Sequence, residues 1–145
     1  MKHAFAFVLA ATVLASQGWA GTQRPRVVVL TDITNEPDDE ESLVRFLVSS
    51  SDYDVEAMIA TTSTWLRKKV RPDKIQAQVR AYKKVYPNLI KHDPRYPSPD
   101  HLLSVTSSHL PVYGMSGVGK GKDSAGSKLL ISVIDKPDKR PVRVT

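Results

Sequence analysis

The stretch 27–41, VVVLTDITNEPDDEE, decides the fold, because an apolar run is followed at once by an acidic loop and a helix start. A continuous Val/Leu run bounded by polar residues is typical of a strand buried on both faces, as in parallel sheets. Pro37 suits the first position of a helix. The stretch therefore predicts strand, loop and helix, and it places Asp32 just past the carboxyl end of the strand. Open α/β sheets bind their ligands at that edge.

The acidic residues of this loop allow two interpretations. Crowded carboxylates repel one another unless they are solvated, protonated or neutralised by a cation. Ca²⁺ accepts carboxylate, carbonyl and water oxygens, whereas Zn²⁺ prefers His or Cys, and the chain has no Cys and four scattered His. The alternative is that acidic residues complement the helix dipole, which is worth about 0.3 to 1 kcal/mol each. That alternative accounts for residues 36–41 but not for Asp32, which precedes the helix.

Residues 29–39, VLTDITNEPDD, resemble the amino-terminal signature of nucleoside hydrolases, in which an Asp after the first strand is followed by an Asp pair. The resemblance is closer to a secreted, nucleoside-hydrolase-like family that carries a cellulose-binding label. In that family the loop between the first Asp and the pair is two residues longer, as it is here. Residues 111–119, PVYGMSGVG, and the Asp-Ser pair at 123–124 are similar to the family's glycine-rich stretch. The resemblance runs from about residue 24 to residue 145.

The resemblance implies an α/β fold, a Rossmann-like parallel sheet with flanking helices, and a hydrolase acting on an N-ribosyl or related glycosidic bond. In that picture Asp32 and Asp39 hold Ca²⁺, and Asp32 also takes a proton from the attacking water. Asp38 accepts a hydrogen bond from a sugar hydroxyl, and Asn35, in the longer part of the loop, is a further candidate sugar contact. The alternative is a carbohydrate-binding (cellulose-binding) protein that keeps the fold without turnover.

A second strand is expected over residues 55–60, VEAMIA, and it ends in the polar run 61–64, TTST. Carboxyl ends of parallel strands meet at one edge, so Thr62 and Thr64 are expected to line the same crevice as Asp32, within about two strand spacings, or 10 Å. Trp65 follows this run. Its ring could stack on a sugar or pack in the core, and both interpretations stay open.

The remainder of the chain alternates helices and strands, which favours a parallel sheet. Pro72 opens a helix that Pro87 is expected to end. Residues 98–99, Ser-Pro, suit the N-cap and first position of a short helix, and another helix is expected from about residue 124. Residues 142–145 read as the beginning of a strand. The helix after residue 124 is expected to bury Leu129, Leu130, Val133 and Ile134.

The glycine-rich run 114–120, GMSGVGK, satisfies the first seven positions of a phosphate-binding P-loop. Gly121 stands where the motif needs a Ser or Thr hydroxyl for Mg²⁺. We therefore expect a glycine-rich turn near the sheet edge, with backbone N–H groups close to a polar ligand, in place of a nucleotide site.

The first 20 residues have a basic start, a short apolar core and a small-residue cleavage pattern, so residues 1–20 are predicted to be a signal peptide. The protein is then secreted or periplasmic, with no membrane anchor after cleavage. Residues 21–145 are expected to be the truncated amino-terminal part of a nucleoside-hydrolase-like domain, since the family places further site residues later in its chain. The net charge is +6. Its basic clusters are short and lack interleaved aromatics, so no nucleic-acid partner is expected.

Overall fold

The protein is described by a computed structural model over residues 23–145, and the expected signal peptide, residues 1–20, lies outside the described residues. Four parallel strands form one sheet in the order β3-β2-β1-β4. The predicted α/β class, a parallel sheet with flanking helices, is confirmed. The elements in chain order are β1 (Arg26–Thr31), α1 (Pro37–Val48), η1 (Ser50–Asp52), β2 (Asp54–Ala60), α2 (Pro72–His92), α3 (Pro99–Ser104), β3 (Thr106–Ser108), η2 (Gly114–Gly117), α4 (Ala125–Ile134) and β4 (Val142–Val144).

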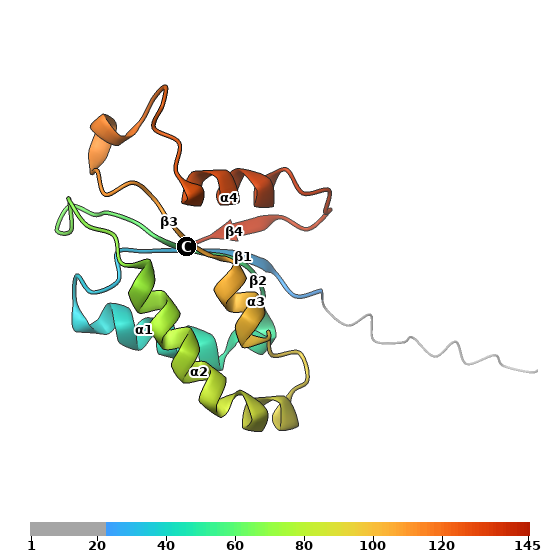
Figure 1. The fold of residues 1–145 in the computed structure, drawn as a ribbon. Coiled ribbons are helices and arrows are strands. Elements are labelled where there is room, and N and C mark those ends of the chain that lie inside the picture. The colour runs from blue at the N-terminus through green and yellow to red at the C-terminus, as the bar shows by residue number, and fades with distance from the viewer. Residues whose placement is uncertain (1–22) are drawn as a thin grey trace, which may run out of the picture.

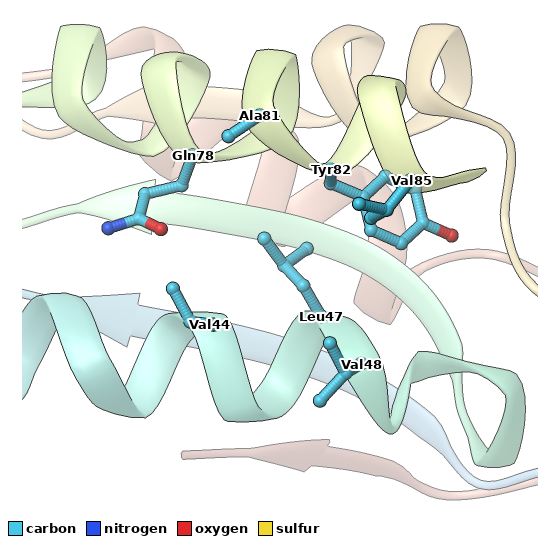
Figure 2. A pocket seen from close by; sticks show the side chains of 7 residues that line it. All are labelled: Val44, Leu47, Val48, Gln78, Ala81, Tyr82 and Val85. Atoms are coloured by element: carbon cyan, nitrogen blue, oxygen red, sulfur yellow. The ribbon is translucent and has the colours of Figure 1, made fainter. Parts of the chain in front are cut away.

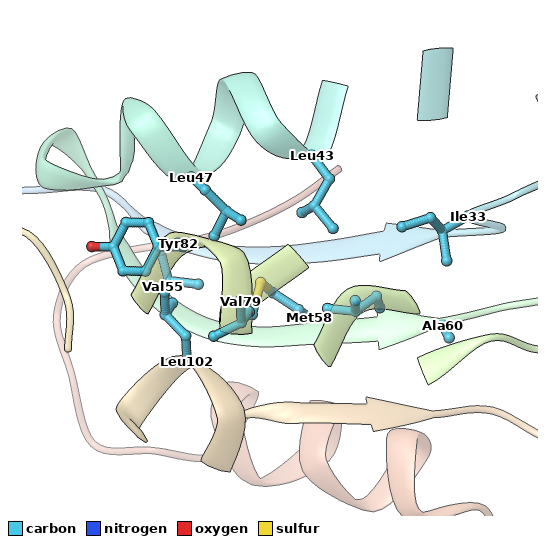
Figure 3. Packing of buried hydrophobic residues seen from close by; sticks show 10 residues of the cluster. Ile33, Leu43, Leu47, Val55, Met58, Ala60, Val79, Tyr82 and Leu102 are labelled. Atoms are coloured by element: carbon cyan, nitrogen blue, oxygen red, sulfur yellow. The ribbon is translucent and has the colours of Figure 1, made fainter. Parts of the chain in front are cut away.

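The helices cover both faces of the sheet unequally. Helices α1, α2 and α3 lie on one face, and α4 covers the other face (Figure 1). The larger core cluster joins the three-helix layer to the sheet, and Met58 of β2 is fully buried in it (Figure 3). A smaller cluster under α4 contains Val28, Ile59 and Val133. Burying one such side chain contributes roughly 1.5 to 3 kcal/mol, so both faces of the central strands contribute to stability.

Local signals set the helix starts. Pro37, Pro72 and Pro99 each occupy a first-turn position, where the missing N–H costs nothing. The Ser98 hydroxyl accepts from the His101 N–H at 3.1 Å, as an N-cap should. Ser124 caps α4 in the same way, by accepting from the Ser127 N–H at 2.9 Å.

Two expectations were wrong. Helix α2 does not end at Pro87 but continues to His92, because Leu89, beyond the proline, packs against the core and offsets the lost hydrogen bond. Ile134, expected to point inward, is 56% exposed at the end of α4. Strand β3, with its polar sequence Thr-Ser-Ser, was not predicted at all.

The amino edge of the sheet contains a buried ion pair that the sequence did not indicate. Arg26 Nε lies 2.7 Å from Glu56 Oε1, and Nη2 of Arg26 lies 3.0 Å from Oε2. The two residues are 2% and 7% exposed. Arg26 Nη2 also donates to the Val133 carbonyl at 2.6 Å, and Lys136 Nζ reaches Glu56 at 3.2 Å. The pair therefore ties β1 and β2 to the carboxyl end of α4. The hydrogen bond from Arg26 lowers the pKa of Glu56.

None of the helices within residues 23–145 combines the length and the apolar character that a membrane span requires.

Candidate functional site

The strand order places a topological switch point between β1 and β4. From β1 the chain adds β2 and then β3 on one side, and it returns to β4 on the other side of β1. In open α/β sheets, ligands bind outside the carboxyl ends of the strands at such a point. A hollow of about 260 Å³ lies there, and its polar lining comes from Thr31, Asp39, Ser42 and Thr145.

Asp32 begins a tight turn directly after β1. The Asn35 N–H donates to the Asp32 carbonyl at 3.1 Å, which closes the turn over four residues. Thr34 in this turn has φ of 80°, a left-handed conformation that β-branched residues rarely adopt. Ile33 is fully buried in the core and anchors the turn. The Asp32 side chain is half-buried.

Asp39 has a structural role as well as a place in the hollow. Its Oδ2 accepts a hydrogen bond from the Glu36 N–H at 3.0 Å, so Asp39 supplies one half of a capping box at the start of α1. Asp38 is exposed in the same turn, and Glu40 lies 3.8 Å from Lys74. The interpretation that the acidic residues stabilise the start of the helix therefore holds for part of the acidic run. The other carboxylate oxygen of Asp39, Oδ1, forms no hydrogen bond among the described residues.

The Thr run lies beside the acidic loop but opens onto a second hollow. The Thr61 N–H donates to the Thr31 carbonyl at 2.8 Å, which brings the end of β2 next to Asp32. Thr62 lines a hollow of about 230 Å³ at the ends of β2 and β3, and its hydroxyl donates to the Val112 carbonyl at 3.4 Å. The Thr64 hydroxyl shares a 2.7 Å hydrogen bond with the Tyr113 hydroxyl. Neither Thr62 nor Thr64 lines the hollow that contains Asp39, and their contact with a sugar stays a prediction.

The glycine-rich run forms part of the wall of this second hollow. Gly114 and Gly117 both line it. Gly114, Gly119 and Gly121 have positive φ, which explains the need for glycine in these turns. Strand β3 ends at Ser108, and irregular chain separates it from the run and from η2. The structure thus gives this run the geometry of a sheet-edge turn and lacks the strand that a P-loop requires.

His109 is a residue of this edge that the sequence did not single out. It follows β3, and its N–H donates to the Ala60 carbonyl at 2.9 Å. Its Nδ1 lies 3.3 Å from the hydroxyl of Ser124, the N-cap of α4. Because the polar β3 carried no strand signal, no pattern indicated that His109 would line the second hollow beside Thr61.

Trp65 does not pack in the core. Its side chain is 80% exposed in the turn after the Thr run, so the packing interpretation is wrong.

A third hollow, of about 280 Å³, lies between α1 and α2 (Figure 2). Val44, Val48 and Val85 form much of its lining, and Gln78 is its main polar side chain. It offers mainly apolar contacts, and the described residues that line it include no carboxylate and no imidazole.

The donor set at the switch point can be tested against a metal. Among residues 23–145, no three His, Cys, Asp or Glu side chains gather in a way that could hold one. The Asp39 carboxylate lines the hollow, whereas Asp32 follows β1 and is not part of that lining. Both are hard oxygen ligands, which suit Ca²⁺ better than Zn²⁺. They would fill two of its roughly six to eight positions, leaving the others to carbonyls, water or ligand oxygens.

The parallel sheet and the acidic loop at its switch point fit a nucleoside-hydrolase-like α/β domain. The chain belongs to the family described as "Cellulose-binding Sde182, nucleoside hydrolase-like domain", which matches residues 26–145.

Among solved structures, the chain is similar to a nucleoside hydrolase-related hypothetical protein from Saccharophagus degradans that is associated with carbohydrate metabolism. The two share 45% sequence identity with a TM-score of 0.81. The match covers 83% of this chain, and this chain spans 29% of that one. The comparison with curated proteins gave no match.

Proposed function

We propose that this chain binds a carbohydrate at the carboxyl edge of its sheet and supplies the acidic, Ca²⁺-dependent part of a glycosidic-bond hydrolase site. The observation that carries the proposal is the position of Asp39 in the hollow at the switch point between β1 and β4. Asp32 directly follows β1 at the same edge, outside the lining of that hollow. The cellulose-binding label of the family and the carbohydrate association of the S. degradans protein support a sugar as the ligand. An N-ribosyl or related glycoside is the proposed substrate class.

The residues of the acidic loop would divide the work. Asp32 and Asp39 would hold Ca²⁺, which when bound would orient sugar hydroxyls and make a water more acidic. Asp32, half-buried at the strand end, would take the proton from that water as general base. Asp38, exposed in the first turn of α1, would accept a hydrogen bond from a sugar hydroxyl, and the half-buried Asn35 would be a further sugar contact through its amide.

A non-catalytic carbohydrate-binding protein is the second candidate. Glycoside hydrolysis commonly needs two carboxyl groups about 5 to 9.5 Å apart across the bond that breaks. Of the described residues that line the two hollows at the carboxyl edge, Asp39 is the single acid. This observation favours sugar binding without turnover by the present chain.

Calorimetric titration with Ca²⁺ tests the metal assignment. Asp32→Asn and Asp39→Asn each remove one formal charge from the site while keeping side-chain size, and both should weaken Ca²⁺ binding. Glu41→Gln is the matched control, since Glu41 is exposed on α1 and lies outside the hollow. Equal affinity in all three variants would eliminate Ca²⁺ from the proposal.

The two candidate functions separate in an activity assay. The protein is incubated with nucleosides and aryl glycosides, with and without a chelator, and its retention on insoluble cellulose is measured in parallel. Hydrolysis that the chelator abolishes supports the hydrolase. Retention on cellulose without turnover supports the binding protein.

We also propose that the protein is exported to the periplasm or the medium after removal of residues 1–20. Amino-terminal sequencing of the protein recovered from those fractions should give Gly21 as the first residue. Recovery in the cytoplasm with Met1 intact would contradict the proposal.

A further inference from the structure

A fourth hollow, of about 370 Å³, lies beside the second hollow and carries positive charge. Two segments form it, the turn after the Thr run and the loop that follows β3. It adjoins the second hollow through Val112, which lines both. Within the part of the chain that the structure describes, no Asp or Glu contributes to its wall. The lining residues are Arg67, Lys68, Pro111, Val112, Tyr113 and Ser116.

The cationic wall is held in place before any ligand arrives. The Arg67 guanidinium carbon lies 5.2 Å from the centroid of the Tyr113 ring, in cation–π contact. Arg67 Nε donates to the Thr64 carbonyl at 2.7 Å, and the Thr64 hydroxyl bonds to the Tyr113 hydroxyl at 2.7 Å. These three contacts use one guanidinium N–H and leave the two terminal amino groups of Arg67 for a ligand.

Neither cation has a protein counter-ion within residues 23–145. Arg67 and Lys68 form no ion pair there, whereas Arg71, Arg95 and Arg140 each pair with an Asp. A planar guanidinium with free terminal groups matches a carboxylate in a bidentate geometry. Because Arg67 and Lys68 have no counter-ion among the described residues, the hollow is suited to an anionic ligand.

An exposed tryptophan stands in the same turn. Trp65 adjoins Thr64 in sequence and is 80% exposed. The Ser63 hydroxyl accepts from the N–H groups of Trp65 and Leu66 at 3.1 and 3.0 Å, so the turn is fixed and presents the indole to solvent. Large aromatic rings exposed at a binding edge offer flat apolar faces on which sugar rings stack.

We propose that this hollow is a subsite for a carboxylated sugar, a uronic acid unit of a polysaccharide. Arg67 and Lys68 bind the carboxylate, and the Tyr113 ring in the wall offers a stacking surface to the sugar. Trp65 does not line the hollow but is exposed two residues before Arg67, and it offers a second ring to a neighbouring sugar unit. The inference rests on the proposed function in taking the ligand to be a saccharide. A neutral glucan unit would leave both cations without a partner. An oligonucleotide is the competing anionic ligand, and it is disfavoured because the cations share one hollow and do not follow a strip.

The test uses Trp65 as reporter. Trp19 and Trp65 are the two tryptophans, and Trp19 falls within the segment proposed to be removed, so Trp65 is the single indole of the protein that begins at Gly21. A hexamer of galacturonic acid is titrated in the presence of EDTA, which prevents Ca²⁺ from bridging ligand and protein. The Trp65 emission should change and saturate. Arg67→Gln and Lys68→Gln should each weaken binding by about tenfold, as expected for the loss of one charge-assisted contact. Lys84→Gln, which removes an exposed charge on α2, should leave the affinity unchanged.

Three outcomes would overturn the inference. One is a cellohexaose that binds as tightly as the galacturonate hexamer, and another is an oligonucleotide of similar charge that does so. The third is that the Arg67→Gln variant and the Lys68→Gln variant both bind the galacturonate hexamer with unchanged affinity. Because EDTA is present, this titration does not depend on the Asp32 and Asp39 metal site. Loss of Ca²⁺ binding with an intact galacturonate response, or the reverse, shows which of the two proposals has failed.

Discussion

The backbone N–H of Thr61 lies 2.8 Å from the carbonyl oxygen of Thr31, one residue beyond the end of β2. This bond continues the parallel ladder to the beginning of the acidic loop, so the two polar runs leave the sheet side by side. The same two strands are joined at their other ends by Arg26 and Glu56. The sheet is therefore fastened at its amino edge and left open for a ligand at its carboxyl edge.

Glu56→Gln should lower the free energy of unfolding by about 3 kcal/mol, because it leaves the Arg26 charge buried without its main partner. This loss lies at the lower end of the range for breaking a buried ion pair, because the Asp138 carboxylate remains 3.8 Å from Arg26 Nε. Urea unfolding followed by circular dichroism measures it. Glu41→Gln, on the exposed side of α1, should change the midpoint little. Equal midpoints for the two variants would show that the pair contributes no net stability.

Stability should fall in acid. The hydrogen bond from Arg26 lowers the pKa of Glu56 below its ordinary value of 4.5. Hydrogen bonds from Arg95 lower the pKa of Asp93 from 3.8 to about 2. A carboxyl group whose pKa is lower in the folded state contributes its full stabilisation at pH values above its pKa in the unfolded state. This stabilisation is lost as the pH falls through the pKa of the folded state. The melting temperature should therefore drop from about pH 4.5 down to about pH 2. Thermal unfolding across pH 2 to 7 checks this, and Glu56→Gln should give a shallower curve.

Gly126→Ala should destabilise the protein, although Gly→Ala in a helix normally stabilises by about 1 kcal/mol. A Cβ at this position would lie 2.7 Å from Ile59 Cγ2 and 2.7 Å from the Ser108 carbonyl oxygen. Because a backbone oxygen cannot rotate away, α4 must shift off the sheet, at a cost of about 1 to 3 kcal/mol. Ser132→Ala, on the exposed side of α4, should stay within about 0.5 kcal/mol of the parent. A more stable Gly126→Ala variant would contradict the close packing of α4.

The two roles of Asp39 can be separated by substitution. Asp39→Ala removes the acceptor for the Glu36 N–H and should cost about 1 kcal/mol of stability. Asp39→Asn keeps a side-chain oxygen for that bond but loses the charge, so its stability should stay near the parent while Ca²⁺ affinity falls. Thermal unfolding without Ca²⁺, followed by calorimetry with it, measures both. Equal stability of the Ala and Asn variants would mean that the cap contributes nothing.

The sequence predicted the elements whose signals are local. The apolar run at 27–30 and the prolines at 37, 72 and 99 each specify an element without help from distant residues, and the helix expected from about residue 124 is also present. Strand β3 forms for a different reason. Its Thr-Ser-Ser sequence has no apolar alternation, and it becomes a strand because its backbone pairs with Met58 to Ala60 of β2.

The sequence predicted where the candidate site lies, but it did not predict that the site is divided into separate hollows. Asp32, Asp39 and the Thr run all lie at the carboxyl edge, as strand ends in a parallel sheet must. That the edge divides into separate hollows depends on the loop after β3, whose Val112 and Tyr113 take up the hydroxyls of Thr62 and Thr64. Contacts across about 50 residues of chain leave no periodic trace in sequence.

The left-handed Thr34 turn connects the ligand edge to the interior. Holding the β-branched Thr34 in this conformation costs about 1 to 2 kcal/mol, and the packing of the neighbouring residues must offset that cost. The main anchor is Ile33, sealed in the core directly behind Asp32. The orientation of the Asp32 carboxylate therefore depends on packing in the core. A substitution that changes the side-chain volume at Ile33 would shift Asp32 without altering any group that a ligand contacts. Selection, natural or in the laboratory, has in that one position a means of adjusting affinity from inside the fold.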